Sequence, residues 1–148
     1  MQKRMILIVE DDERFVRMLS FLFSAKDFNV KTSKNGLEAW DFLEENIPAI
    51  IIMDLIMPIM DGFSLYRKIR DLERLKDIPI IILSGLSIEA VTEKLKTYDF
   101  NRYLRKPFRT ADLLALTTDA ISTLEGTSGH FKNCLNSEKF LELKRLKE

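Results

Sequence analysis

Short apolar runs alternate with longer amphipathic segments along most of the chain, and this alternation constrains the fold more than any other feature. Three runs are almost continuously aliphatic, at residues 5–9, 49–53 and 78–83. Runs of this length and composition are typical of parallel strands that are buried on both faces. Two weaker strands are expected at 29–32 and 102–105.

The segments between these runs have helical periodicity, with apolar residues three and four positions apart. Helices are expected at 12–25, 36–46, 63–75, 87–98 and 110–124. Thr110 is the expected N-cap of the last helix, with Asp112 in its first turn. Strict alternation of strand and helix predicts an α/β fold, in which a parallel sheet carries helices on both faces. In such sheets the site lies outside the carboxyl ends of the strands.

Composition limits the class of protein. The 148 residues suit one ordinary domain, and 46% of them are hydrophobic, which excludes an intrinsically disordered chain. Lysine and arginine number 23, as do aspartate and glutamate, so the formal net charge is zero. This balance argues against direct nucleic-acid binding by charge.

Membrane insertion and disulfide formation are not expected. The most apolar window, 47–60, contains Asp54 and two prolines, whereas a membrane span needs about 20 apolar residues. Cys134 is the single cysteine, which excludes an internal disulfide and fits a reducing compartment. We therefore expect a cytoplasmic protein that makes no membrane contact.

Polar and charged residues follow four of the five expected strands. Asp11 and Asp12 follow the first strand, Asp54 the third, Ser84 the fourth and Lys106 the fifth. The fold would bring the three aspartates into one pocket, where their charges repel. A hard divalent cation, above all Mg²⁺, relieves that repulsion. An acidic run at a strand–helix junction has an alternative explanation, because acidic side chains also stabilise helix N-termini.

A carboxylate, a Mg²⁺ ion, a lysine and a hydroxyl together suit phosphoryl transfer. A carboxylate can act as the nucleophile and form an acyl phosphate, and Asp54 is the best placed for this role. At this point the residues resemble the receiver domain of bacterial two-component response regulators, over roughly residues 3–124. The resemblance rests on the segment 54–62, the pair Asp11-Asp12, Ser84, and Lys106-Pro107-Phe108. It implies a doubly wound, flavodoxin-like sheet with five parallel strands in the order 2-1-3-4-5.

The resemblance also implies roles for single residues. Asp54 would accept the phosphoryl group. Asp12, Asp54 and the backbone carbonyl of Ile56 would ligate Mg²⁺, while Asp11 would orient bound water or assist the metal. Ile56 also carries an apolar side chain two residues past the acceptor. Our hypothesis is that this side chain shields the acyl phosphate from water.

Further implied roles concern the other strand ends and the turn after the acceptor. Lys106 would pair with the phosphoryl oxygens, and the Lys106–Pro107 bond would be cis. Ser84 would move to hydrogen-bond the phosphoryl group, and Tyr103 would follow by rotating inward. Gly62 would supply a backbone turn that a side chain hinders.

The implied protein is a phospho-accepting signalling module and not a classical enzyme, with self-catalysed phosphotransfer and autodephosphorylation. Its phosphoryl donor would be a histidine kinase or a histidine phosphotransfer protein. Its output would pass to a downstream protein or to a missing output domain, and it would be a monomer or weak dimer. Residues 99–100 are Asp-Phe where the family commonly has Gly-Ala. We expect Phe100 to be exposed on the signalling face.

Two domain segments are expected: a receiver domain at 1–125 and a short C-terminal extension at 126–148. The extension includes a candidate helix at 138–147, and 23 residues are too few for an output domain. It could dock on the receiver, mediate a dimer or begin a linker, or it could be a solvated, frayed end.

Three other functions compete with this interpretation. A phosphohydrolase of the haloacid-dehalogenase type needs a second aspartate two residues after the nucleophile, and Ile56 cannot serve as that acid. A flavodoxin-like cofactor binder needs a phosphate cradle after the first strand, where residues 10–13 would repel phosphate. A receiver-shaped scaffold that is never phosphorylated remains the third alternative.

Overall fold

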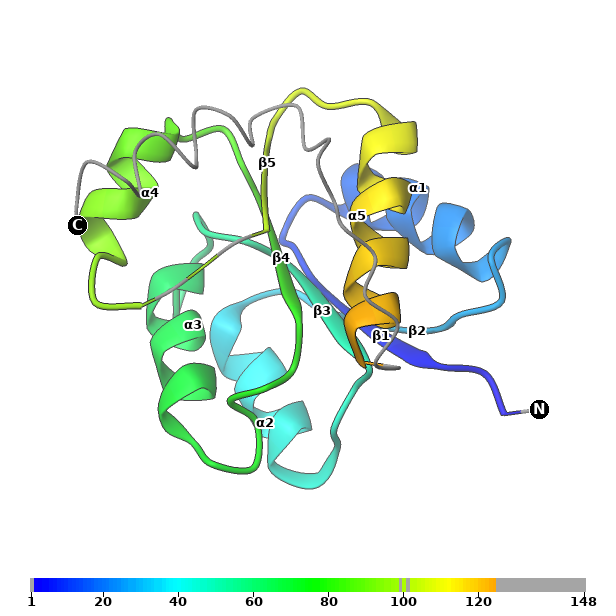
Figure 1. Cartoon of the computed structure of the whole chain (residues 1–148), viewed down its shortest axis with the longest axis horizontal. Helices are drawn as coiled ribbons and strands as arrows, with labels where there is room; N and C mark the ends of the chain where they lie inside the picture. The colour runs from blue at the N-terminus through cyan, green and yellow to red at the C-terminus, as the bar shows by residue number, and fades with distance from the viewer. Residues whose placement is uncertain (1, 99, 101, 125–148) are drawn as a thin grey trace. The chain divides into compact units, whose positions relative to one another are not determined.

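Five strands and five helices alternate in the computed structural model, which describes residues 2–98, 100 and 102–124 (Figure 1). The strands are β1 (Met5–Val9), β2 (Asn29–Ser33), β3 (Ile50–Asp54), β4 (Ile80–Ser84) and β5 (Tyr103–Arg105). They form one sheet in the order β2-β1-β3-β4-β5. The predicted flavodoxin-like strand order is therefore confirmed.

The helices are α1 (Glu13–Ser24), α2 (Gly36–Glu45), α3 (Gly62–Asp71), α4 (Ile88–Lys94) and α5 (Thr110–Leu124). Polar side chains cap four of them at the N-terminus, where the first amides have no partner inside the helix. The caps are Asp12, Asn35, Asp61 and Ser87. Helix α5 differs from the prediction that Thr110 is its N-cap. Thr110 is the first helical residue, and the carbonyl of Arg109, the residue before it, accepts from the amide of Leu113.

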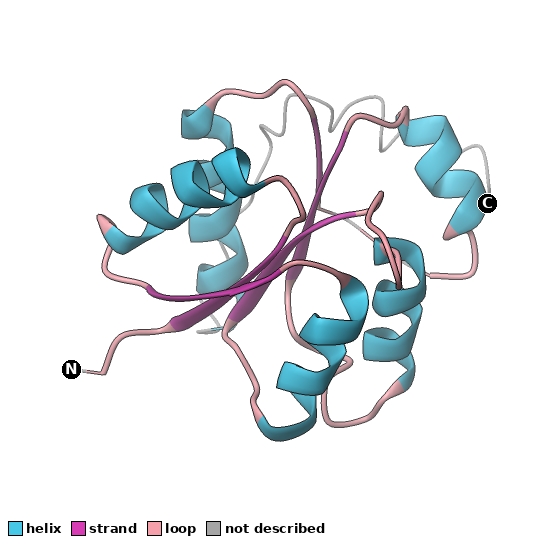
Figure 2. Ribbon diagram, turned by 180° about the vertical axis from the view of Figure 1, so that it is seen from behind, coloured by secondary structure: helices cyan, strands magenta, loops and turns pink. Residues whose placement is uncertain are grey.

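The chain divides into two compact units, Met1–Ile80 and Ile81–Glu148. In the first unit, β1 pairs in parallel with both β2 and β3, so that Ile6 lies opposite Val30 on one side and Ile50 on the other. Helix α1 covers one face of these strands, and α2 and α3 lie side by side on the other (Figures 1 and 2). The parallel register places the carboxyl ends of β1 and β3 next to each other.

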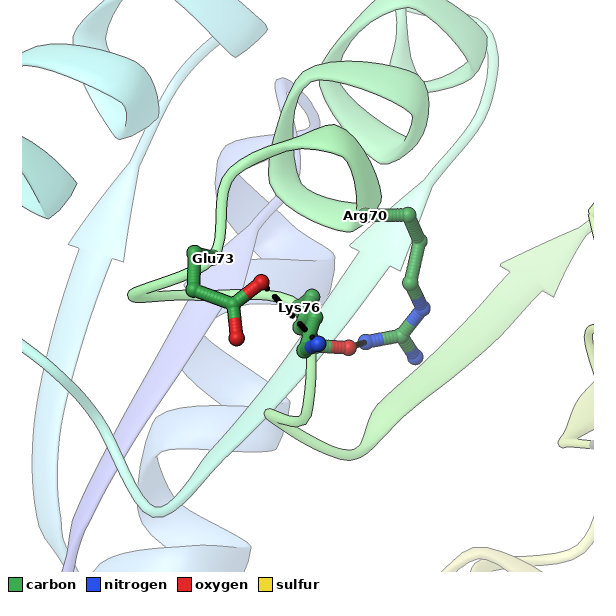
Figure 3. Close-up of polar contacts among 3 residues, drawn as sticks. All are labelled: Arg70, Glu73 and Lys76. Carbon is green, nitrogen blue, oxygen red and sulfur yellow. Dashed lines mark hydrogen bonds and ion pairs between the residues drawn. The ribbon is translucent and has the colours of Figure 1, made fainter.

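Helix α3 ends at Asp71, four residues before the predicted end at residue 75. The chain leaves the helix there in a turn. The Nη1 atom of Arg70 holds this turn by donating to the carbonyl oxygen of Lys76 at 2.7 Å (Figure 3). The same atom donates to the carbonyl oxygen of Ile78, also at 2.7 Å. Within the turn, Lys76 Nζ lies 3.0 Å from Glu73 Oε2, and this hydrogen bond raises the pKa of Lys76. The turn precedes β4, which begins after Pro79 because proline has no amide hydrogen for the strand ladder.

In the second unit, β4 and β5 pair in parallel, with Leu83 opposite Leu104. Arg102, just before β5, lies 3.8 Å from Asp119 on α5, and both side chains are largely buried. Burial raises the pKa of Asp119, and the positive charge of Arg102 opposes part of that rise. Phe100 is only 5% exposed, so the expectation of an exposed phenyl ring was wrong. The side chain contributes to the core, as its size and apolarity favour.

Among the described residues, no helix is long and apolar enough to cross a membrane. The predicted extension at 126–148, with its candidate helix and Cys134, lies outside the described residues. Asp99 lies outside them as well.

Candidate functional site

Three carboxylates meet where β1 and β3 end. Glu10 follows β1 directly, Asp11 comes next, and Asp54 is the last residue of β3. One carboxylate oxygen from each lies within 4.8 Å of the others. Glu10 is only 4% exposed, and its amide donates to the carbonyl of Ser33 at the end of β2. The parallel register of the sheet therefore creates the cluster, as predicted for Asp11 and Asp54.

Asp12 has a different position from the one expected. Its Oδ1 atom accepts hydrogen bonds from the amides of Arg14 (3.0 Å) and Phe15 (3.3 Å), which makes Asp12 the N-cap of α1. It is not part of the carboxylate cluster, and Glu10 stands there in its place. The alternative explanation of the acidic run, that it stabilises a helix N-terminus, thus applies to Asp12. The start of α1 at Glu13 would have revealed this position, because it makes Asp12 the N-cap. An N-cap carboxylate faces its own helix.

The loop after β3, residues 55–61, is called the acceptor loop here. The Oδ1 atom of Asp54 accepts from the amides of Leu55 (2.7 Å) and Ile56 (3.4 Å), which orients the carboxylate at the start of this loop. At the other end, the amide of Gly62 donates to the carbonyl of Leu55 at 2.9 Å. A Cβ atom on Gly62 would lie 2.2 Å from the carbonyl oxygen of Asp54. The prediction that a side chain would hinder this turn is confirmed.

Two exposed isoleucines lie on the acceptor loop. Ile56 has 58% of its surface exposed, and Ile59 has 79%. Ile59 also has a φ of 70°, a left-handed conformation that is unfavourable for a β-branched residue. Such conformations persist only where the surrounding structure imposes them.

Two more of the predicted residues come together in the second unit. Ser84 ends β4 and is completely buried, and its carbonyl accepts from the amide of Lys106 at 2.8 Å. The Lys106–Pro107 peptide bond is cis, as the resemblance implied. The hydroxyl oxygen of Ser84 accepts from the amide of Leu86 at 3.2 Å. One backbone hydrogen bond between Lys106 and Ser84, the two residues predicted to bind a phosphoryl group, thus joins the ends of β5 and β4.

Tyr103 lies on β5 and is buried. Its hydroxyl donates to the carbonyl of Leu86 and, at 3.4 Å, to that of Ser84. Ser84 is the last residue of β4, and Leu86 lies in the segment that leads from β4 to α4. The side chain is therefore buried and hydrogen-bonded to the end of β4 and to the segment after it.

The carboxylate cluster suits a hard cation. Carboxylate and carbonyl oxygens are the ligands that Mg²⁺ and Ca²⁺ take in proteins, and three carboxylates at this spacing repel one another without a counter-charge. The cluster has no nitrogen or sulfur ligand of the kind that favours zinc. Glu10, Asp11 and Asp54 thus fit a Mg²⁺ site by the chemistry of their donor atoms.

A comparison with known sequence families decides the class of protein. The sequence profile of the response regulator receiver domain matches residues 6–118, which is most of the chain. This chain belongs to the response regulator receiver domain family. Receiver domains are signalling modules of two-component systems, and they bind Mg²⁺ in an acidic pocket.

Individual relatives extend this family assignment. Response regulator Rre1 of Synechocystis is 29% identical over 147 residues, which cover 96% of this chain and 63% of that protein. "Probable transcriptional regulator ycf29" of Porphyra purpurea is 30% identical over 90% of this chain and 59% of its own length. The chain thus spans about three-fifths of the length of these two relatives. The polar-differentiation response regulator DivK of Brucella anthropi is 28% identical over 69% of this chain and 83% of its own length.

Solved structures agree with this receiver fold. The signal receiver domain of a histidine kinase from Syntrophus aciditrophicus superimposes with a TM-score of 0.77 at 27% identity, covering 88% of this chain and 98% of that one. A receiver domain of a sensor histidine kinase from Pseudomonas aeruginosa gives a TM-score of 0.74 at 28% identity, covering 81% and 98%. That receiver has a magnesium ion coordinated in its active-site cleft.

Proposed function

We propose that this receiver accepts a phosphoryl group on Asp54 from a phosphohistidine donor, with Mg²⁺ bound by Glu10, Asp11, Asp54 and the backbone carbonyl of Ile56. The convergence of the three carboxylates within 4.8 Å is the observation that carries the proposal. The ligand set differs from the sequence prediction because Glu10 replaces Asp12 and because Asp11, expected to orient water or assist the metal, becomes a ligand.

The chemistry needs a nucleophile and compensation for charge. A carboxylate oxygen of Asp54 forms a bond to phosphorus as the bond from phosphorus to the imidazole nitrogen of the donor breaks. The imidazole leaves, and Asp54 becomes an acyl phosphate. Bound Mg²⁺ supplies positive charge beside the transferring oxygens. The ammonium group of Lys106 supplies a second positive charge in this proposal.

The response would be a shift between two arrangements of the segment after β4. Ser84 would donate a hydrogen bond from its hydroxyl to a phosphoryl oxygen, which favours the arrangement in which Tyr103 is inward. The buried Tyr103 hydroxyl, which donates to Leu86 and Ser84, supports this role because it connects β5 to that segment.

The donor in this proposal is a histidine kinase or a histidine phosphotransfer protein in the cytoplasm, and the output is a downstream protein or a further domain. Receiver domains in general interact with such kinases and with downstream partners. The chain spans only about three-fifths of the length of its first two relatives, so we propose its output and do not take it from them. We propose autodephosphorylation as well.

Intact mass after incubation with acetyl phosphate tests the proposal. We expect a gain of one phosphoryl group that requires Mg²⁺ and is absent in Asp54→Asn. Asp41→Asn is the matched control, since Asp41 is an exposed aspartate on α2. Labelling of Asp54→Asn would place the phosphoryl group on another residue and overturn the proposal. No labelling and no beryllofluoride complex with the unchanged chain would leave a receiver-shaped scaffold as the better explanation.

A further inference from the structure

The N-terminus of α2 makes a contact that lies outside its own helix. The first amides of a helix have no intrahelical acceptor. Asn35 caps the amide of Glu38 with its Oδ1 atom at 2.8 Å. The amide of Gly36, the first residue of α2, instead donates to the carbonyl of Met60 in the acceptor loop at 2.9 Å. An otherwise unused donor of α2 is therefore hydrogen-bonded to the loop that follows Asp54.

Only glycine fits at this contact. A Cβ atom on Gly36 would lie 2.6 Å from the carbonyl oxygen of Met60 and 2.9 Å from its Cγ atom. The first distance is shorter than real Cβ atoms show, and the obstacle is backbone, which cannot rotate away. Position 36 therefore needs glycine because α2 and the acceptor loop approach each other closely there.

Helix α3 holds the opposite end of the loop in the same way. Gly62 is its first residue, and its amide donates to the carbonyl of Leu55. The acceptor loop is therefore fixed at Leu55 by α3 and at Met60 by α2. Ile59 lies between these two points with its unfavourable φ of 70°. The two fixed points explain how the loop keeps this conformation, since strain of this kind needs support from its surroundings.

We infer that Gly36 is a positioning residue for the metal site, acting through the Met60 carbonyl to hold the acceptor loop, and with it the Ile56 carbonyl, in the geometry that binds Mg²⁺. The inference rests on the proposed function, in which that carbonyl is a ligand. It assigns α2, a helix with no ligand of its own, a part in the site. Groups that orient metal ligands without touching the metal affect affinity strongly.

Isothermal titration calorimetry with MgCl₂ on Gly36→Ala tests this inference. The added Cβ should displace the Met60 carbonyl and weaken Mg²⁺ binding about tenfold or more, as for other changes behind a metal's ligands. The matched control is Asn35→Ala, which removes the neighbouring cap and destabilises the same helix without adding an atom near Met60. We expect Asn35→Ala to lower the thermal midpoint and to bind Mg²⁺ within about twofold of the unchanged chain.

Equal Mg²⁺ affinity of Gly36→Ala and Asn35→Ala would overturn the positioning role and leave a purely structural glycine. If the unchanged chain itself does not bind Mg²⁺, the proposed function fails first, so the two failures are distinguishable. Should Gly36→Ala not fold, amide hydrogen exchange of the unchanged chain decides the question. Protection of the Gly36 amide should rise when Mg²⁺ is added, and unchanged protection at saturating Mg²⁺ would contradict the inference.

Discussion

Replacement of Asp12 by alanine separates the two explanations of the acidic run after β1. In the structure this carboxylate accepts two amide hydrogen bonds at the start of α1 and takes no part in the carboxylate cluster. Loss of an N-cap costs about 1 kcal/mol, and loss of a negative charge at a helix N-terminus costs about 0.5 kcal/mol. We therefore expect the free energy of unfolding to fall by about 1.5 kcal/mol, which lowers Tm by about 4 °C for a chain of this size.

Mg²⁺ affinity should depend little on Asp12 and strongly on Glu10. Asp12 is exposed, and interactions of exposed charges are worth about 1 kcal/mol at most, so Asp12→Ala should weaken Mg²⁺ binding less than about fivefold. Glu10→Gln keeps an acceptor oxygen for the amide of Asp12 but removes a charge from the cluster, so we expect at least about a tenfold loss.

Urea unfolding and calorimetric Mg²⁺ titration of the same protein samples measure both quantities. Asp12→Asn is the matched control, because asparagine caps a helix nearly as well as aspartate and should recover most of the lost stability. The reasoning is refuted if Asp12→Ala loses Mg²⁺ binding tenfold or more while Glu10→Gln retains it. That result would restore the ligand set expected from the sequence.

Three further predictions concern the acceptor loop and α5. Ile59→Asn should raise the free energy of unfolding by about 0.5–1 kcal/mol, because asparagine tolerates a positive φ; Ile59→Val keeps the β-branch and should bring no gain in urea unfolding. Ile56→Asn should shorten the half-life of the acyl phosphate, as followed by loss of label; an unchanged half-life would remove the shielding hypothesis. Because burial raises the pKa of Asp119, the unchanged chain should lose stability relative to Asp119→Asn as the pH rises above about 4 and through that raised pKa. Urea unfolding at several pH values measures this difference, and a pH-independent difference would contradict the assignment.

The sequence predicted the fold well because its pattern is strong and local. Aliphatic runs such as those of β1 and β3 have few alternatives to buried parallel strands, and each was found within one residue of its expected start. Boundaries were less predictable where side chains distant in the sequence intervene. The end of α3 depends on Arg70, whose guanidinium group holds carbonyls six and eight residues away.

The site shows the same division. Alternation of strands and helices is sufficient to predict that Asp11 and Asp54 meet at one edge of the sheet, since parallel strands end at that edge. The sequence pattern could not decide whether Glu10 or Asp12 joins the carboxylate cluster. Acidic residues within one short run differ only in the direction in which the backbone points their side chains. Phe100 was misjudged for a related reason, since a residue after a helix has no periodic pattern that would reveal its burial.

The sequence by itself determined the succession of strands and helices, the chemistry of the residues that end them and the family to which the chain belongs. Hydrophobic periodicity and short motifs carry that information locally. Only the tertiary structure decided which carboxylates form the cluster, and it alone showed that Gly36 of α2 contacts Met60 of the acceptor loop. These features depend on distances of a few ångströms between segments that are far apart in the chain, and no pattern within one segment encodes them.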